Sequence, residues 1–409
     1  MLQRDQIPEQ PDPLEFGKKL MGWHITGAKV LADHASGTAL ACTDVALCGT
    51  HITRVGAPDV PPPAGTRRLD ASGLWVLPGI IDVHGDGFER HLAPRRGMVS
   101  DLSANLRFVE TELAACGITT AWLAQFWSWE GGMRGPDFAT RLATALHTTK
   151  PAQRLDLRMQ LRLETHMIAD QTAVQALISD TEIDYLVFND HLPHQALAQG
   201  KTPPRLNGSA LKAGRSPQAH LDMMLRLAEL APQVGPFARK IITDNPHMRF
   251  GSHDDADAKM RDSWAALGAS IAEFPVTRAA AEAAVADGTP VVMGAPNVLR
   301  GGSHNRGAVS ATALVADGLV SALASDYHYP AMIGAAFALV EGGICDIAQA
   351  WHLLSAGPAQ VMGLKDRGRI AEGQRADLIL LCPKTRRVLG SFCAGAPVFL
   401  SGDLVERLD

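Results

Sequence analysis

Several common signals are missing from this 409-residue sequence. The six cysteines include no C-x-x-C pair and are too few for a disulfide scaffold, so we expect free thiols in a reducing compartment. No apolar run reaches the ~18 residues that a membrane helix needs, and the first residues lack the apolar core of a secretory signal. No G-x-G-x-x-G follows a strand-like run, so a dinucleotide-binding sheet has no support. We therefore expect a cytoplasmic protein.

Charge is nearly balanced along the chain. The 38 basic and 43 acidic residues give a formal net charge of −5, and 46% of residues are hydrophobic, as in an ordinary globular protein. A basic surface for nucleic acid or for a membrane is therefore not expected. The sequence leaves the oligomeric state open, with a homo-oligomer as one option.

Strand-like and helical patterns alternate over residues 75–364. Leu102, Leu106 and Leu113, for example, recur at helical spacing, and Gly117 then precedes a new strand-like run. Such alternation favours a (β/α)₈ TIM barrel or a doubly wound sheet, and the missing glycine fingerprint favours the barrel. Short β-type runs in residues 1–74 and 365–409 predict a small β-sandwich domain built from both chain termini.

The most informative stretch is residues 77–86, where an apolar run leads into His84 and Asp86. Side chains of a strand alternate with period two, so these two side chains project from the same face. Histidine and aspartate side by side at a strand end predict half of a metal site.

Further histidines and carboxylates follow the later strand-like runs. Because catalytic residues of a (β/α)₈ barrel lie at the carboxyl ends of its strands, these side chains are expected to meet. The candidate metal ligands are His84, Asp86, Glu164, His191, His253 and Asp326. Six such groups can hold two divalent metals ~3.5–4 Å apart with a hydroxide between them. A site without thiolates suits Zn, Mn or Fe. Alone, each residue also has a structural interpretation, such as a solvated histidine or a helix cap.

The order H-x-D, then Glu, His, His and Asp, with the Leu77-Pro78-Gly79 lead-in, resembles the amidohydrolase superfamily of metal-dependent hydrolases. The segments S-H-D-D at residues 252–255 and P-N-x-x-R-G-G-S-H at residues 296–304 resemble the branch that contains the α-D-ribose 1-methylphosphonate 5-triphosphate diphosphatases. This resemblance implies metal ligands at the six positions, with Glu164 bridging the metals. The ligand expected at the fourth barrel strand is either Glu164 or His166.

The resemblance also implies hydrolysis of a triphosphate with release of diphosphate, a step of phosphonate breakdown. Asp326 would be the catalytic proton acceptor, and the phosphorylated small-molecule substrate would bind at a basic, glycine-containing loop. The expected substrate-binding residues are Arg95, Arg300, Gly301, Gly302, Ser303 and His304. Residues 196–220 carry four basic residues and no acid, so they form either a basic lid or a solvated flexible loop.

Two other functions stay open at this point. The same metal site can hydrolyse a C–N bond of a cyclic amide or an aminated ring, and Phe126, Trp127 and Trp129 would suit a flat ring. A barrel that has lost catalysis and acts as a binding protein is the second alternative, and it would bind little or no metal.

Overall fold

A computed structural model describes residues 22–34, 37–56, 65–93, 101–302 and 307–408. The chain divides into two compact units, one made of Met1–Gly79 with Arg369–Asp409 and the other of Ile80–Gly368. Of the residues predicted to bind substrate, Arg95, Ser303 and His304 lie outside the described residues. No helix in the described ranges has both the length and the apolar character that crossing a membrane requires.

The second unit is the predicted (β/α)₈ barrel. Its parallel strands are hydrogen-bonded in chain order, and the first and last are joined by a bridge between Gly85 and Asp326. Two backbone hydrogen bonds complete this closure, from Asp326 N to His84 O at 2.9 Å and from Asp86 N to Asp326 O at 2.8 Å. The strands are β6 (Ile80–Gly85), β7 (Ile118–Trp127), β8 (Asp156–Glu164), β9 (Tyr185–Asn189), β10 (Arg249–His253), β11 (Ile271–Glu273), β12 (Val291–Gly294) and β13 (Ala322–Ala324).

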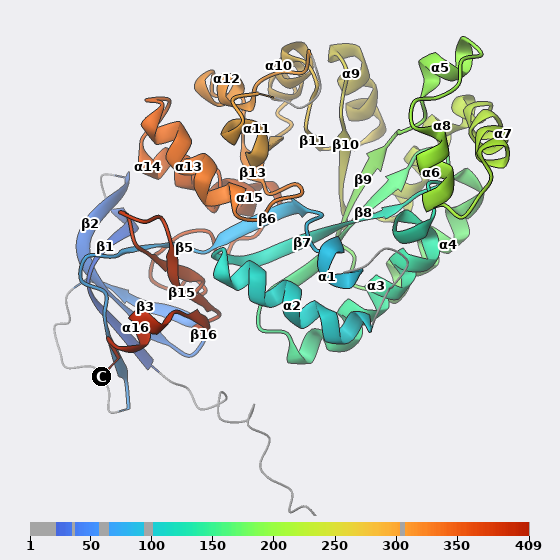
Figure 1. Cartoon of the computed structure of the whole chain (residues 1–409). Coiled ribbons are helices and arrows are strands. Elements are labelled where there is room, and N and C mark those ends of the chain that lie inside the picture. Colours follow the sequence, from blue (N-terminus) through green and yellow to red (C-terminus); the bar gives the residue numbers. More distant parts are fainter. Residues whose placement is uncertain (1–21, 35–36, 57–64, 94–100, 303–306, 409) are drawn as a thin grey trace, which may run out of the picture. The chain divides into compact units, whose positions relative to one another are not determined.

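Helices follow the barrel strands and lie around them (Figure 1). In α2, Asp101 accepts a hydrogen bond from the Ala104 N–H at 3.1 Å and caps the first turn, and the predicted apolar stripe is buried. The helices are α1 (Glu89–Leu92), α2 (Leu102–Ala115), α3 (Pro136–Thr149), α4 (Gln171–Asp180), α5 (His194–Ala198), α6 (Leu206–Lys212), α7 (Pro217–Ala228), α8 (Ala231–Asp244), α9 (Ala258–Leu267), α10 (Arg278–Ala286), α11 (Ala295–Leu299), α12 (Ala311–Ala316), α13 (Ala331–Glu341), α14 (Ile347–His352) and α15 (Ala356–Val361).

Residues 196–220 contribute to three short helices, α5, α6 and α7. Their apolar side chains pack together in a buried cluster with Trp129, which precedes α3. Arg215 Nη1 also donates a hydrogen bond to the Trp129 carbonyl oxygen at 2.7 Å. This stretch is therefore a packed helical element of the barrel unit and not an open loop.

The first unit is one connected eight-stranded sheet built from both ends of the chain, together with the short helix α16 (Gly402–Val405). Strand β1 is long enough to pair with β4 through its first half and with β5 farther along. Strand β5 also pairs with β14, in antiparallel register with Pro78 opposite Leu378. The strands are β1 (Gly22–His34), β2 (Gly37–Cys48), β3 (His51–Val55), β4 (Arg67–Asp70), β5 (Trp75–Pro78), β14 (Leu378–Leu381), β15 (Val388–Cys393) and β16 (Ala396–Leu400).

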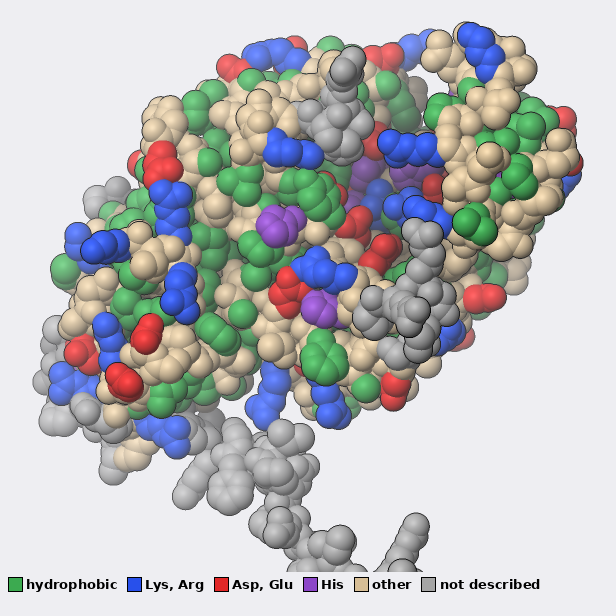
Figure 2. Space-filling model, viewed as in Figure 1, with side chains coloured by type: hydrophobic (Ala, Val, Ile, Leu, Met, Phe, Trp, Pro, Cys, Tyr) green, Lys and Arg blue, Asp and Glu red, His purple; other side chains and the backbone are tan. Residues whose placement is uncertain are grey.

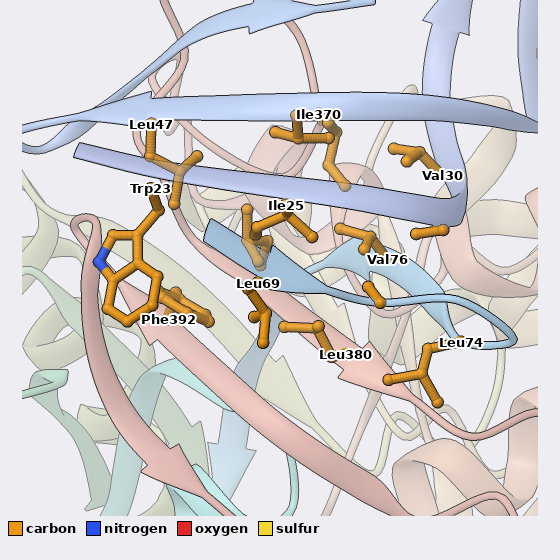
Figure 3. Packing of buried hydrophobic residues seen from close by; sticks show 14 of the residues in the cluster. Trp23, Ile25, Val30, Leu47, Leu69, Leu74, Val76, Ile370, Leu380 and Phe392 are labelled. Carbon is orange, nitrogen blue, oxygen red and sulfur yellow. The ribbon is translucent and has the colours of Figure 1, made fainter. Parts of the chain in front are cut away.

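The core of this sheet unit is apolar (Figure 3). Trp23 and Phe392 meet edge to face, with ring centroids 5.2 Å apart and an interplanar angle of 80°. Ile25, Val76 and Leu380 are fully buried beside them. Burial of each such side chain contributes about 1.5–3 kcal/mol, so residues from the two termini stabilise the same core.

Candidate active site

A cavity of about 230 Å³ lies at the carboxyl ends of the barrel strands. Four of the six predicted ligands line it, namely Asp86, His191, His253 and Asp326. The other two, His84 and Glu164, have no exposed surface. Figure 2 shows acidic, basic and histidine side chains together in a hollow on one face of the molecule. Strand ends that are far apart in sequence therefore bring charged side chains to one place.

The backbone is strained at this cavity. Asp254, Phe274 and Asp326 have positive φ angles of 59°, 52° and 56°, and all three line the cavity. Asp254 directly follows β10, Phe274 directly follows β11, and Asp326 comes two residues after β13. Left-handed backbone in residues other than glycine costs on the order of 1 kcal/mol or more, and such strain concentrates at functional sites. This strain supports a functional role for the cavity.

His84 is held in one orientation by the barrel interior. Its Nδ1 donates to Glu273 Oε2 at 2.7 Å, which leaves the lone pair on Nε2. That Nε2 is buried and has no hydrogen-bond partner among the described residues. A histidine whose second nitrogen is fixed by a carboxylate is typical of metal ligands. A divalent metal bound at Nε2 would satisfy the unpartnered atom, so the residue fits the predicted site.

Glu273 is a member of the site that the sequence analysis missed. It is fully buried, and it also accepts hydrogen bonds from Gln160 Nε2 and Tyr185 Oη, both at 2.6 Å. Burial alone would raise the pKa of Glu273, but His84 and the donated hydrogen bonds outweigh burial and hold that pKa below its usual value. Its place at the end of β11 follows the same strand-end rule that identified the other ligands.

His253 lies beside His84, with ring centroids 5.4 Å apart. One ligand atom each from His84, His253 and Glu273 lies within 4.8 Å of the others. His253 Nδ1 is 3.1 Å from Asp254 Oδ2, and its Nε2 accepts a hydrogen bond from Arg162 Nη2 at 3.3 Å. His84 and His253 can bind a divalent metal through nitrogen, and Glu273, which accepts from His84 Nδ1, would orient His84 for that ion.

Glu164 and His191 form a second part of the site. Glu164 Oε1 pairs directly with His191 Nδ1, and Oε2 accepts hydrogen bonds at 3.2 Å from Trp129 Nε1 and from the His191 N–H. Burial lowers the pKa of His191, but Glu164 outweighs burial and raises it. Glu164 ends the third barrel strand, β8, so the expectation of a fourth-strand ligand is wrong for both Glu164 and His166. His166 belongs to a separate group with Asp190 and His194.

Asp86 and Asp326 complete the predicted set at the closure of the barrel. Their main chains are joined by the 2.8 Å hydrogen bond, and both side chains line the cavity. Asp86 Oδ2 lies 3.8 Å from Arg162 Nη1. The six predicted ligands therefore adjoin one cavity, but they are distributed among three places around it.

Arg162 is the second site residue that the sequence analysis missed. It is 5% exposed, and its Nε donates to Asn189 Oδ1 at 3.4 Å. Its guanidinium lies 3.9 Å from the centre of the Phe126 ring, and Arg134 lies 4.3 Å from the same ring. Burial lowers the pKa of Arg162. Arg162 shares the strand phase of Glu164, and this signal in the sequence could have identified it.

The glycine-containing loop predicted to bind phosphate follows α11, which begins directly after β12. Arg300 lines the cavity, and Gly301 has a φ of 70°. Asn297 anchors this region, because its Nδ2 donates to the Val309 carbonyl oxygen at 3.2 Å and its Oδ1 accepts from the Ala311 N–H at 3.0 Å. Gly301 and Gly302 have open space where a side chain would begin, so a ligand can approach their backbone.

A larger cavity of about 1130 Å³ adjoins the first and shares Arg134 and His191 with it. Arg141 of α3 and two basic residues of the segment 196–220, Arg205 and Lys212, also line it. Helix α6, the residues just before it and Met224 of α7 thus form a wall of this larger cavity.

Comparison with known proteins identifies the family. No family model matches the chain. It is 31% identical, over 332 residues that cover 79% of this chain and 87% of the relative, to the α-D-ribose 1-methylphosphonate 5-triphosphate diphosphatase of Escherichia coli strain K12. The chain belongs to the amidohydrolase superfamily. The predicted resemblance is therefore confirmed, and the protein is a hydrolase by family.

Solved structures agree with this amidohydrolase fold. An amidohydrolase from a Sargasso Sea environmental sample has a TM-score of 0.59 at 16% identity, with 93% of each chain covered. N-acetylglucosamine-6-phosphate deacetylase of Pasteurella multocida has a TM-score of 0.61 at 11% identity, covering 92% of this chain and 99% of the other. Guanine deaminase of E. coli has a TM-score of 0.59 at 13% identity, covering 93% and 99%. These structures share the fold.

Proposed function

We propose that this amidohydrolase hydrolyses a phosphoric anhydride and releases diphosphate from α-D-ribose 1-methylphosphonate 5-triphosphate, the compound in the name of the E. coli relative. The observation that carries the proposal is the set of arginines lining the catalytic cavity, Arg134, Arg162 and Arg300. Of the three, Arg162 is the one removed from water: it is 5% exposed, and Asp86 Oδ2 lies 3.8 Å from its Nη1, beyond hydrogen-bond distance, whereas Arg134 already pairs with Glu130 at 2.6 Å. Removing a guanidinium from water costs several kcal/mol unless an anion compensates it. Phosphate oxygens, which accept paired hydrogen bonds from arginine, provide that compensation.

The chain's own residues have distinct roles in this proposal. His84, His253 and the adjoining carboxylates would hold divalent metal ions, which would lower the pKa of a bound water and offset charge on the phosphoryl oxygens. Asp326 would accept the proton as the water oxygen attacks the α-phosphorus. The bond from that phosphorus to the diphosphate oxygen then breaks, which leaves a ribose 5-phosphate that still carries the phosphonate. Arg162 and Arg300 would orient the triphosphate.

The larger cavity supports a substrate that is longer than a triphosphate. Its volume of about 1130 Å³ has room for a pentose, and it joins the catalytic cavity at Arg134 and His191. Arg141, Arg205 and Lys212 lie on its wall, where they would attract the phosphonate.

The aromatic residues favour this function over the C–N alternative. The Phe126 ring already has Arg162 and Arg134 within 4.3 Å of its centre. Trp127 Nε1 donates to Asp170 Oδ2 at 2.8 Å, and Trp129 Nε1 donates to Glu164. These aromatic side chains contact charged groups of the protein itself, so they are already engaged and do not need a flat substrate to stack on them.

The test is diphosphate release from the triphosphate by protein of measured metal content. Arg162→Met should raise KM at least ~10-fold, since a charge-assisted pair is lost, and Arg162→Lys should recover part of the loss. Exposed Arg226→Met is the matched control. Wild-type protein that contains metal but hydrolyses a cyclic amide, and releases no diphosphate, would overturn the proposal.

A further inference from the structure

A second group of metal-ligand side chains lies at the ends of β8 and β9. One ligand atom each from His166, Asp190 and His194 lies within 4.8 Å of the others. None of these residues lines either cavity. We propose that this group is a separate site for a transition-metal dication such as Zn²⁺, which links helix α5 to the barrel.

The three donors are held by their local backbone. Thr165 N donates to the Asn189 carbonyl oxygen at 2.9 Å, which joins the loops that follow β8 and β9. Asp190 Oδ1 accepts from the Leu192 N–H at 3.1 Å, and its Oδ2 pairs with His194 Nε2 at 2.7 Å. These contacts position the donors before any ion binds, so less conformational entropy is lost on binding.

His166 gives the second indication of a ligand. Its side chain is 2% exposed, and its Nε2 is buried with no hydrogen-bond partner among the described residues. An imidazole nitrogen left unsatisfied in this way costs about 1–3 kcal/mol, so such an atom calls for a specific explanation. The other nitrogen, Nδ1, is 3.1 Å from Thr165 Oγ1 and 3.7 Å from Asp190 Oδ1. A metal ion coordinated at His166 Nε2 would remove the cost.

The chemistry and the exposure of the group suit a transition metal. Two imidazoles and one carboxylate favour Zn²⁺, Co²⁺ or Ni²⁺, whereas Ca²⁺ and Mg²⁺ prefer oxygen donors only. The His194 and Asp190 side chains are 48% and 26% exposed, so an ion can enter from solvent and keep water in its remaining positions. The group of His84, His253 and Glu273, in contrast, is buried.

An ion at this site would affect the wall of the larger cavity. His194 is the first residue of α5, which begins the α5–α7 segment, and Asp190 directly precedes His191. The ion would therefore stabilise α5, whose Leu197 packs in one cluster with Leu206 of α6, the helix that carries Lys212. Since it lies outside the cavities, its occupancy can be measured separately from catalysis.

The experiment uses the full-length protein, stripped with a chelator and then reloaded with Zn²⁺. We expect His194→Ala and Asp190→Asn each to bind one equivalent less than the wild type in metal analysis. Exposed His247→Ala should match the wild type. Because these two variants bind one ion fewer, Zn²⁺ addition should raise their Tm by less than it raises the Tm of the wild type. Equal metal content and an equal rise in Tm in the wild type and both variants would overturn the proposal, whether or not diphosphate is released.

Discussion

The two units of this chain both have apolar cores, but they differ in the charged groups buried beside them. The sheet unit has a core of aliphatic and aromatic side chains, in which Trp23 packs against Phe392. The barrel, in contrast, buries His84, Arg162 and Glu273 around its strand ends. Apolar burial stabilises a fold directly, whereas each buried charge needs a partner. The barrel has apolar clusters of its own, but the candidate ligands lie in it and not in the sheet unit. Substitutions in the sheet core can therefore change stability separately from the binding chemistry.

The largest expected effect is on catalysis, from Asp326→Asn. Turnover should fall on the order of 10²–10⁴-fold because the amide cannot accept the proton. The free energy of unfolding should change little, since the main-chain hydrogen bonds between Asp86, Asp326 and His84 do not need the carboxylate. Diphosphate release and urea unfolding check the two halves of this prediction. Full activity in the variant would remove Asp326 from the proposed mechanism.

The reverse outcome is expected for Phe392→Ala in the sheet unit. The fully buried ring leaves a cavity, so the unit should lose about 3–5 kcal/mol of unfolding free energy. Metal content per folded molecule should stay at the wild-type value. Calorimetry and metal analysis measure these quantities, with half-exposed Val405→Ala as the control. A proportional loss of metal would contradict the separation between the two units.

Glu273→Gln tests whether a buried charge of the barrel acts by orienting a metal ligand. The neutral amide should hold His84 less firmly, and loss of such a partner typically weakens metal affinity 10–100-fold. The measurement is competition for metal with a chromophoric chelator. Exposed Glu282→Gln on α10 serves as the control, and unchanged affinity in Glu273→Gln would show that His84 needs no carboxylate partner.

The smallest effect is expected at Asp156, at the beginning of β8. Burial raises its pKa, but the hydrogen bonds and charges of Arg158 and Arg367 outweigh burial and lower the pKa to about 2. At pH values above the unfolded pKa near 4, this depressed pKa contributes about 2 kcal/mol to the free energy of unfolding. The contribution disappears as the pH falls towards 2. Asp156→Asn should therefore be less stable at pH 7, and the difference should diminish towards pH 2. Urea unfolding at pH 7 and pH 3 tests the sign, and an equal difference at both values would contradict it.

Much of the barrel could be predicted from the sequence, because strand-like runs and strand-end side chains follow simple periodicities. His84 and Asp326 were placed at strand ends in this way, and the structure brings both to the same barrel closure. Strand periodicity does not predict how deeply a side chain is buried or which cavity it reaches. Arg158 and Arg162 share one strand phase, yet Arg158 pairs with Asp156 and Asp184 while Arg162 reaches the catalytic cavity. Their tertiary surroundings distinguish them.

The helical nature of residues 196–220 was harder to predict. Glycine, proline and serine in this stretch favoured a lid or a flexible loop, but Ser216 caps α7 and Pro217 occupies its first turn. Leu197 and Leu206 then pack with Trp129, which lies far away in the sequence. A contact of that range leaves no local pattern, so the packing could not be predicted from the segment alone.

The pairing of β5 with β14 has a consequence for synthesis on the ribosome. Trp75–Pro78 emerges early, but its partner Leu378–Leu381 is translated only near the end of the chain. Throughout elongation the nascent polypeptide therefore carries an unpaired β5 edge, the kind of surface on which other chains can associate. A ribosome that stalls within the barrel would leave this edge permanently open.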